Sequence, residues 1–284
     1  MSDTGDGWQI ARRRKGGRRS KTCQPCLSSA CCPEPLDVSR VVRRVRSELR
    51  CEEFWDKWRE QILVAGSSAP NPPESKDRDG EGNTDVPVSQ QWECICYGLG
   101  SFSSSVSARY QLAMLLLLLD AKQISVKDCS VYDPVFTSGE IDVLRELGLT
   151  VLTDNEEGKR LSTRPTVFYL MHCGKALYNN LLWKNWSKKC LPLMKIIGNS
   201  FTSMKERTLE REFKRDYSYI ALATAICQER RLPCPSRMVD VFSDTAVITF
   251  AAHSLNSLPQ STWTDPPEPE YHHVSDLEII RGGN

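Results

Sequence analysis

The chain has 284 residues, of which 40% are hydrophobic and 26% are charged, and its formal net charge is +1. This length suffices for one sizeable domain with flanking segments, and the near-neutral charge excludes a whole-molecule field that would recruit nucleic acid or a membrane. The longest apolar run, 112–119, is too short to span a bilayer. Because no apolar leader follows Met1, we expect a protein of the cytoplasm, and also of the nucleus, whose 12 cysteines are mostly reduced.

Residues 1–35 are predicted to be disordered, because the basic side chains and glycines that dominate them bury nothing. The basic run 12–21 is typical of a nuclear-import signal or a nucleic-acid patch, and equally of a solvated tail. Four cysteines follow: Cys23, Cys26, Cys31 and Cys32. The first two have the spacing of half a zinc site, which makes the four weak metal candidates, and a flexible cysteine-bearing tail is the alternative.

One long amphipathic helix is predicted over 36–64, with Asp37 as its N-cap. Apolar residues recur along it at helical spacing, and arginines fill the other face of its first half. That face could contact nucleic acid, but a helix that packs on the main domain with its charges in water fits the pattern better. Residues 65–90 are rich in Gly, Ser, Pro, Asp and Glu and are predicted to be a disordered linker.

The main domain is predicted over 91–255, where apolar strands alternate with helical stretches. The expected strands are 93–97, 129–132, 149–152, 166–171 and 195–197, and the expected helices are 104–121, 138–147 and 175–186. Such alternation predicts an α/β fold, a Rossmann-like three-layer sandwich with a mostly parallel sheet. A helix over 212–230 and apolar segments over 239–242 and 246–250 complete the core, and 256–284 is predicted to be a disordered tail.

Polar residues follow each of the five predicted strands. In an open α/β sheet the ligand lies outside the carboxyl ends of the strands, so we expect these residues to share one edge and to bind a small molecule. The hypothetical ligand-binding residues are Gly98, Gly100, Ser101, Ser103, Asp133, Glu156, His172 and Asn199.

The turn after the first strand contains Gly98 and Gly100, the first half of a dinucleotide-binding fingerprint. Ser103 stands where the third glycine is expected, which argues against a standard NAD(P) dehydrogenase, although the serines could supply hydroxyls and an N-cap to a phosphate. Asp133 ends the second strand, where an acidic residue commonly binds ribose hydroxyls, and a turn that starts at Asp133 is the alternative. Nucleotides and S-adenosylmethionine are therefore candidate ligands.

His172 and Cys173 are adjacent at a strand end, where neighbouring side chains point to opposite sides, so we do not expect a nucleophile–base pair. His172 is interpreted as a ligand contact or general base, with a structural histidine as the alternative. Cysteine–proline pairs at Cys32 and Cys234 make haem a weak further candidate. The sequence contains no metalloprotease, nucleophile-elbow or P-loop motif, and it assigns no catalytic residue.

Several motifs of the main domain occur in the order that is typical of a known family. They are CYGLGSF at 96–102, YDPVF at 132–136, NEEGK at 155–159, YLMHC at 169–173, YNNLLW at 178–183 and IGNSF at 197–201. On these motifs, roughly 90–255 resembles the sensitivity-to-red-light-reduced (SRR-like) domain, most of all its animal members. The resemblance implies a regulatory protein of circadian clock gene expression and of haem biosynthesis, without an assigned activity, cofactor or protein partner. A nucleotide- or S-adenosylmethionine-dependent transferase and an interaction module with a vestigial site are the alternatives.

Overall fold

The structure is a computed structural model that describes residues 37–64, 91–272 and 274. Two sets of predictions fall outside those residues: the N-terminal segment with Cys23, Cys26, Cys31 and Cys32, and the linker over 65–90. No helix of the described ranges is long and apolar enough to cross a bilayer. The same ranges contain no group of three His, Cys, Asp or Glu side chains that could hold a metal ion.

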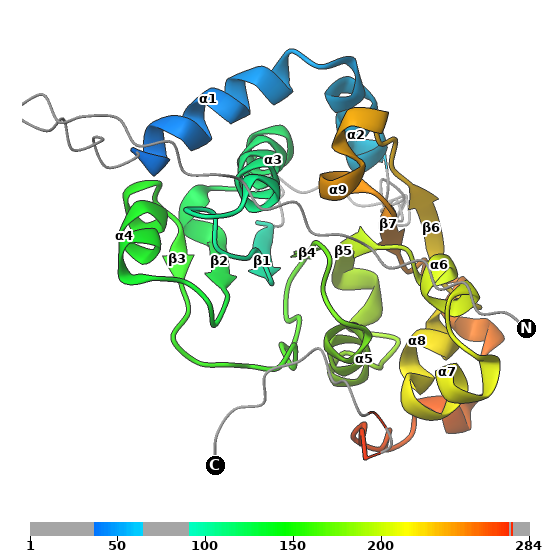
Figure 1. The fold of residues 1–284 in the computed structure, drawn as a ribbon. Helices are drawn as coiled ribbons and strands as arrows, with labels where there is room; N and C mark the ends of the chain where they lie inside the picture. The colour runs from blue at the N-terminus through cyan, green and yellow to red at the C-terminus, as the bar shows by residue number, and fades with distance from the viewer. Residues whose placement is uncertain (1–36, 65–90, 273, 275–284) are drawn as a thin grey trace, which may run out of the picture. The chain divides into compact units, whose positions relative to one another are not determined.

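Seven strands of the described chain form one sheet in the order β3-β2-β1-β4-β5-β7-β6 (Figure 1). Their bounds are β1 Glu93–Tyr97, β2 Cys129–Tyr132, β3 Thr150–Val151, β4 Thr166–Leu170, β5 Met194–Asn199, β6 Gln228–Arg231 and β7 Thr245–Thr249. The strands β1 to β5 pair in parallel, whereas β7 is antiparallel to both β5 and β6. The α/β prediction is confirmed, but the sheet is mixed, because the chain closes this edge with an antiparallel pair.

The predicted helix over 212–230 is wrong in its second half. The structure has two short helices, α7 (Glu210–Asp216) and α8 (Ser218–Ala223), and then the strand β6. Tyr217 ends the first helix with a non-helical φ of −128°. The residues of β6 are mostly exposed and polar, as is common for an edge strand, so no apolar alternation indicates it in the sequence.

The single helix predicted over 36–64 is two helices, α1 (Val38–Arg50) and α2 (Glu53–Val64). The chain turns at Cys51, whose N–H donates to Glu48 O at 3.2 Å. After the turn, Trp58 donates its indole N–H to the carbonyl of Pro233 at 2.7 Å and is fully buried. The apolar spacing continues across the turn, which is why the sequence alone does not reveal it.

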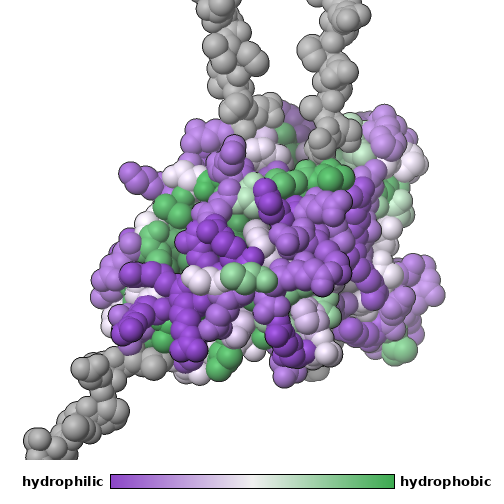
Figure 2. All heavy atoms as spheres, turned by 90° about the horizontal axis from the view of Figure 1, so that it is seen from above, coloured by the Kyte–Doolittle hydropathy of each residue, from purple (hydrophilic) through white to green (hydrophobic). Residues whose placement is uncertain are grey.

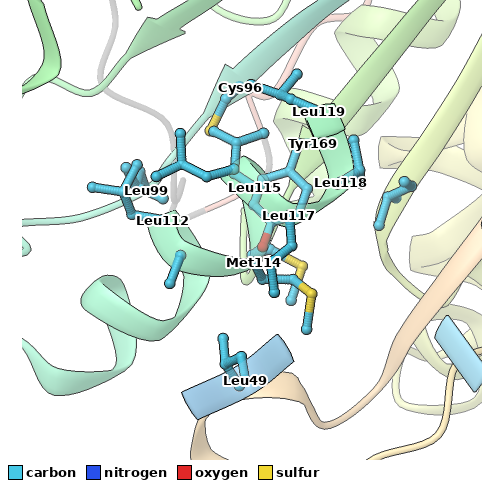
Figure 3. Close-up of a cluster of buried hydrophobic side chains, with 14 of the residues drawn as sticks. Leu49, Cys96, Leu99, Leu112, Met114, Leu115, Leu117, Leu118, Leu119 and Tyr169 are labelled. Atoms are coloured by element: carbon cyan, nitrogen blue, oxygen red, sulfur yellow. The ribbon is translucent and has the colours of Figure 1, made fainter. Parts of the chain in front are cut away.

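Helices cover both faces of the sheet, each over its own hydrophobic core. On one face α3 (Val106–Lys122) lies between the sheet and α1, with α2, α4 (Ser138–Glu146) and α9 (Val239–Phe242) around it. Leu49 of α1 and Cys96 of β1 lie on opposite sides of α3, so its leucines are buried all round (Figure 3). On the other face lie α5 (Lys175–Lys184), α6 (Phe201–Glu206), α7 and α8.

The arginine face of α1 is directed to solvent. Figure 2, which views the molecule from the side of α1, shows a largely hydrophilic surface with smaller hydrophobic areas. Arg46 and Arg50 bind Asp120 of α3, and Arg44 pairs with Glu48 along α1 itself. The opposite side of α1 is buried on α3 through Val42, Val45 and Leu49. The helix therefore packs on the main domain with its charges in water.

The segment from residue 256 to 272 packs on α5, contrary to the disorder predicted for 256–284. The ring of Trp263 stacks on Trp186 with 5.6 Å between ring centres. Tyr271 is buried, and its hydroxyl lies 2.7 Å from Asn180 Oδ1. These anchors are single aromatic residues that prolines and polar residues separate, so they leave no periodic pattern in the sequence.

Tyr271→Phe is expected to lower the free energy of unfolding by about 1–2 kcal/mol, because the change leaves the amide of Asn180 and the carbonyl of Ala176 without this buried hydroxyl. Urea denaturation at neutral pH measures the loss. Tyr110→Phe is the control, since the Tyr110 hydroxyl makes no hydrogen bond within the described part of the chain. Equal effects of the two variants would contradict the anchoring role of Tyr271.

Candidate functional site

The strand order reverses next to β1. From β1 the chain moves to β2 and β3 on one side and then to β4 and β5 on the other. In an α/β sheet a crevice opens at such a switch point, outside the carboxyl ends of the strands. A cavity of about 370 Å³ lies there, lined by residues that follow β1, β2, β3 and β4. We call it the switch-point cavity.

The structure brings together only part of the predicted ligand-binding set. Gly98, Asp133 and His172 line the switch-point cavity, together with Asn155, Glu157 and Cys173. Glu156 lies next to it, where its carboxylate accepts a hydrogen bond from the hydroxyl of Tyr97. Asn199 lines a neighbouring cavity, whereas Gly100, Ser101 and Ser103 are not among the residues that line either one.

Gly98 makes room for the thiol of Cys173. Its φ is +67°, and a Cβ at this position would lie 2.5 Å from Cys173 Sγ. The thiol lies 3.3 Å from the carbonyl oxygen of Tyr97, to which it donates. The sequence suggests that glycine lets the backbone approach a phosphate, but the close approach here is to a side chain of this chain.

Asp133 holds the turns after β1 and β2 together. One carboxylate oxygen accepts the N–H of Gly100 at 2.7 Å, and the other accepts the N–H of Val135 at 3.0 Å. The second bond is the one expected of an aspartate that starts a turn, so the structural alternative applies to Asp133. Each oxygen keeps a further lone pair, so the carboxylate can still accept from a ligand hydroxyl in the cavity.

Glu140 is a buried carboxylate that the sequence analysis did not single out. It accepts the N–H of Ser103 and the hydroxyl of Ser101, both at 2.8 Å, and the N–H of Thr137 at 2.9 Å. Burial alone would raise the pKa of Glu140, but hydrogen bonds from Thr137, Ser103 and Ser101 outweigh it and lower this pKa to about 2. The Thr137-x-x-Glu140 spacing of a capping box is visible in the sequence, but its contact with the serine turn is not.

These contacts bear on the phosphate-binding turn expected after β1. The N–H groups of Gly100 and Ser103 donate to Asp133 and Glu140, so two carboxylates of the chain occupy places that a phosphate would take. Ser105, and not a ligand, caps α3 by accepting the N–H of Ala108. A pyrophosphate that bound to the N–H groups of Gly100 and Ser103 would have to displace Asp133 and Glu140.

Tyr97 is buried beneath the switch-point cavity. Burial, and then its hydrogen bond to Glu156, raise the pKa of Tyr97 well above its ordinary value, so the hydroxyl is a donor at neutral pH. Glu156 in turn accepts from Arg160 at 2.7 Å. On the same loop, Lys159 bridges Glu157 at 3.0 Å and Glu268 at 2.7 Å. Ion pairs therefore hold the loop after β3 in place.

His172 and Cys173 each contact a backbone carbonyl group of another segment. The Nε2 of His172 lies 2.8 Å from the carbonyl oxygen of Val241 in α9, which assigns the proton to Nε2. The residue is exposed and has a φ of +53°. Its Nε2 is thus engaged in a structural bond, whereas its other ring nitrogen is the acceptor open to a general-base role.

A second cavity, of about 230 Å³, shares His172 and Cys173 with the first. Lys175, Arg207 and Asp244 line it, and so does Asn199. The N–H of Asn199 donates to the Tyr178 hydroxyl at 2.8 Å, which fixes the end of β5. We call this space the second cavity.

Cys234 does not have the setting of a haem ligand. Its thiol lies 3.4 Å from the carbonyl oxygen of Met238, to which it donates. Burial raises the pKa of Cys234, which disfavours the thiolate that would bind iron. The other cysteine–proline pair, at Cys32, lies outside the described residues.

The chain is similar to known proteins that share one domain family. Residues 80–265 match the model of the SRR1 domain. The chain is 55% identical to the SRR1-like protein of Mus musculus over 130 residues, which are 45% of this chain and 52% of that protein. It is 30% identical to the SRR1-like protein of Drosophila melanogaster over 171 residues, which are 60% of this chain and 59% of that protein.

A plant protein is similar over a comparable stretch. The Arabidopsis thaliana protein named SENSITIVITY TO RED LIGHT REDUCED 1 is 31% identical over 173 residues, which are 61% of this chain and 58% of that protein. In all three comparisons this chain spans between half and three fifths of the relative's length.

Proposed function

The chain belongs to the SRR1 domain family, and from that premise we propose that it is a regulatory protein controlled by a small ligand in the switch-point cavity. The resemblance sets the context of the proposal: circadian clock gene expression and regulation of haem biosynthesis, in the cytoplasm and the nucleus. The name of the Arabidopsis relative refers to sensitivity to red light, which is a response and not a reaction. That name supports a regulatory role.

One observation carries the ligand part of the proposal: segments after four strands line a single cavity of about 370 Å³ at the switch point. This volume lies within the range of about 300–1,000 Å³ that is usual for small-molecule sites. Asp133 lies in its lining at the end of β2, where doubly wound proteins bind ribose. A ribose-bearing ligand therefore fits the position.

The charged side chains of the switch-point cavity restrict the class of ligand that it can bind. The lining of the switch-point cavity includes the carboxylates of Asp133 and Glu157 and neither lysine nor arginine, although Lys159, outside the lining, pairs with Glu157. The N–H groups of Gly100 and Ser103 are already bound to carboxylates. These features disfavour a phosphate in this cavity and favour a neutral or cationic nucleoside. We therefore propose a nucleoside-type ligand, of which S-adenosylmethionine, with its sulfonium, is one example.

A transferase that uses S-adenosylmethionine is the second candidate, because the same cavity would hold its cofactor. The side chains at the cavity give it less support. The thiol of Cys173 donates to the Tyr97 carbonyl, and Nε2 of His172 is bonded to Val241. We therefore place regulation before catalysis. An interaction module with a vestigial site predicts no ligand at all.

Thermal unfolding in the presence of S-adenosylmethionine, adenosine, NAD⁺ and haem tests the proposal. A nucleoside at about 100 times its dissociation constant should stabilise the protein by about 2.7 kcal/mol. Val135 is 51% exposed and lines the cavity, so Val135→Trp should fill the entrance and remove the shift. Leu161→Trp is the matched control, since Leu161 is 47% exposed and does not line the cavity.

The screen also separates the alternatives. No shift with any of these compounds would contradict the ligand proposal and favour the interaction module. Methyl transfer from S-adenosylmethionine to an acceptor would establish the transferase. NAD⁺ that binds more tightly than adenosine through the β1 turn would contradict the argument from Asp133 and Glu140.

A further inference from the structure

The two cavities adjoin and differ in charge. Both linings include His172 and Cys173, so these two residues lie where the cavities adjoin. The charged side chains that line the switch-point cavity include Asp133 and Glu157, whereas the second cavity brings together Lys175 and the ion pair of Arg207 with Asp244. A single ligand in both would meet the carboxylate of Asp133 at one end, and Lys175 with the Arg207–Asp244 pair at the other.

We propose that the second cavity binds an anionic group, carboxylate or phosphate, of the same ligand whose nucleoside part occupies the switch-point cavity. This inference rests on the proposed function, because it extends the same site from the ends of β1, β2, β3 and β4 to the end of β5. It also specifies the ligand class: a nucleoside that carries an anionic group a few bonds from its ribose.

Lys175 is the first part of the argument. Its ammonium group lies 5.4 Å from the centre of the Tyr217 ring, and no ion pair within the described residues includes it. It is also the first residue of α5, where the helix dipole disfavours a cation. A lysine here does not help the helix, but it adds to the wall of the second cavity a positive charge that no carboxylate of the described residues pairs with.

Arg207 and Asp244 are the second part. Arg207 forms an ion pair with the carboxylate of Asp244 at 3.1 Å through one nitrogen, and the remaining N–H groups of its guanidinium can donate to a ligand anion. Arg207 ends α6, and it lines the second cavity together with Asn199, the last residue of β5. Asp244 in turn offers a carboxylate to an ammonium group, if the ligand carries one.

The volume of the second cavity suits the head group of a ligand rather than a whole ligand. The second cavity measures about 230 Å³, below the usual range for a complete small-molecule site of about 300–1,000 Å³. A water molecule takes about 30 Å³ of liquid volume, so the space suffices for a phosphate or an amino-acid group. The nucleoside then has to lie in the larger cavity next to it.

Calorimetric titration of the full chain with three adenine compounds tests the inference. 5′-Methylthioadenosine has no anionic group, S-adenosylhomocysteine carries an amino-acid head group, and AMP carries a phosphate. We expect S-adenosylhomocysteine, AMP or both to bind about tenfold more tightly than methylthioadenosine, as one good ion pair would give. Which of the two gains identifies carboxylate or phosphate as the anion.

Lys175→Gln and Arg207→Gln should each reduce this gain to less than about threefold and leave the affinity for methylthioadenosine unchanged. Lys184→Gln, at the other end of α5, is the matched control and should keep the full gain. Unchanged binding of methylthioadenosine also shows that the variants are folded, because it requires an intact switch-point cavity.

The outcomes distinguish the two proposals. Equal affinity for all three compounds would overturn the anion subsite and leave the nucleoside site standing. A gain that persists in both Lys175→Gln and Arg207→Gln would overturn it as well. Failure of every compound to bind would instead overturn the proposed function, and the inference with it.

Discussion

Glu140→Gln is expected to lower the free energy of unfolding by about 3 kcal/mol at neutral pH. The pKa of Glu140 falls from 4.5 to about 2 on folding, and each pKa unit corresponds to about 1.4 kcal/mol. The amide of glutamine has one acceptor where the carboxylate has two, so it would face the N–H and hydroxyl donors of Thr137 with a donor of its own. Urea denaturation at pH 7 measures the loss.

The pH dependence of this effect has a definite sign. Because folding depresses the pKa of Glu140, its contribution is complete above pH 4.5 and is lost as the pH falls toward 2. The difference in stability between the native chain and Glu140→Gln should therefore shrink over that window. Glu146→Gln is the control, since Glu146 is exposed on the same helix and should cost less than about 0.5 kcal/mol. Similar losses in both variants would contradict this account.

Gly98→Ala is expected to cost about 3 kcal/mol. The left-handed backbone at φ +67° accounts for about 1–2 kcal/mol of this cost, because a Cβ clashes with its own carbonyl there. Overpacking adds about 1–3 kcal/mol, since the new methyl group would lie 2.5 Å from Cys173 Sγ. The side chain at the cavity wall must shift, so binding of the nucleoside probes should weaken as well.

A double-mutant cycle separates the two causes. Cys173→Ala removes the sulfur atom, so in that background Gly98→Ala should cost only the backbone part, about 1–2 kcal/mol. Equilibrium denaturation of the four proteins in the cycle gives the coupling. Strictly additive effects of the two substitutions would show that the thiol does not limit the space at Gly98.

The buried part of the sheet is where sequence prediction succeeds. The bounds of β1 and β2 match those predicted, because both strands are short apolar runs that end at turn residues. The charged strand β6 escapes detection, since nothing apolar distinguishes it from the end of a helix. The turn at Cys51 escapes it too, because the apolar face continues from α1 into α2.

The candidate site shows a similar division. The rule that ligands bind at the carboxyl ends of strands selects Gly98, Asp133 and His172, which line one cavity, although their binding roles stay predictions. The sequence does not indicate that carboxylates already occupy the β1 turn. Asp133 lies 33 residues from Gly100, and Glu140 lies 37 residues from Ser103, so only the folded chain brings them together.

The contacts of Trp263 and Tyr271 with the main domain limit how far the C-terminus of this protein can be truncated. A truncation at residue 255, the domain boundary predicted from the sequence, would remove Trp263, which stacks on Trp186. It would also remove Tyr271, whose hydroxyl binds the amide of Asn180. The match to the SRR1 domain model ends at residue 265, which is also short of Tyr271. A stable fragment for binding experiments therefore has to extend past Tyr271. A protease that cuts between Trp263 and Tyr271 would weaken the packing of the C-terminal segment on α5.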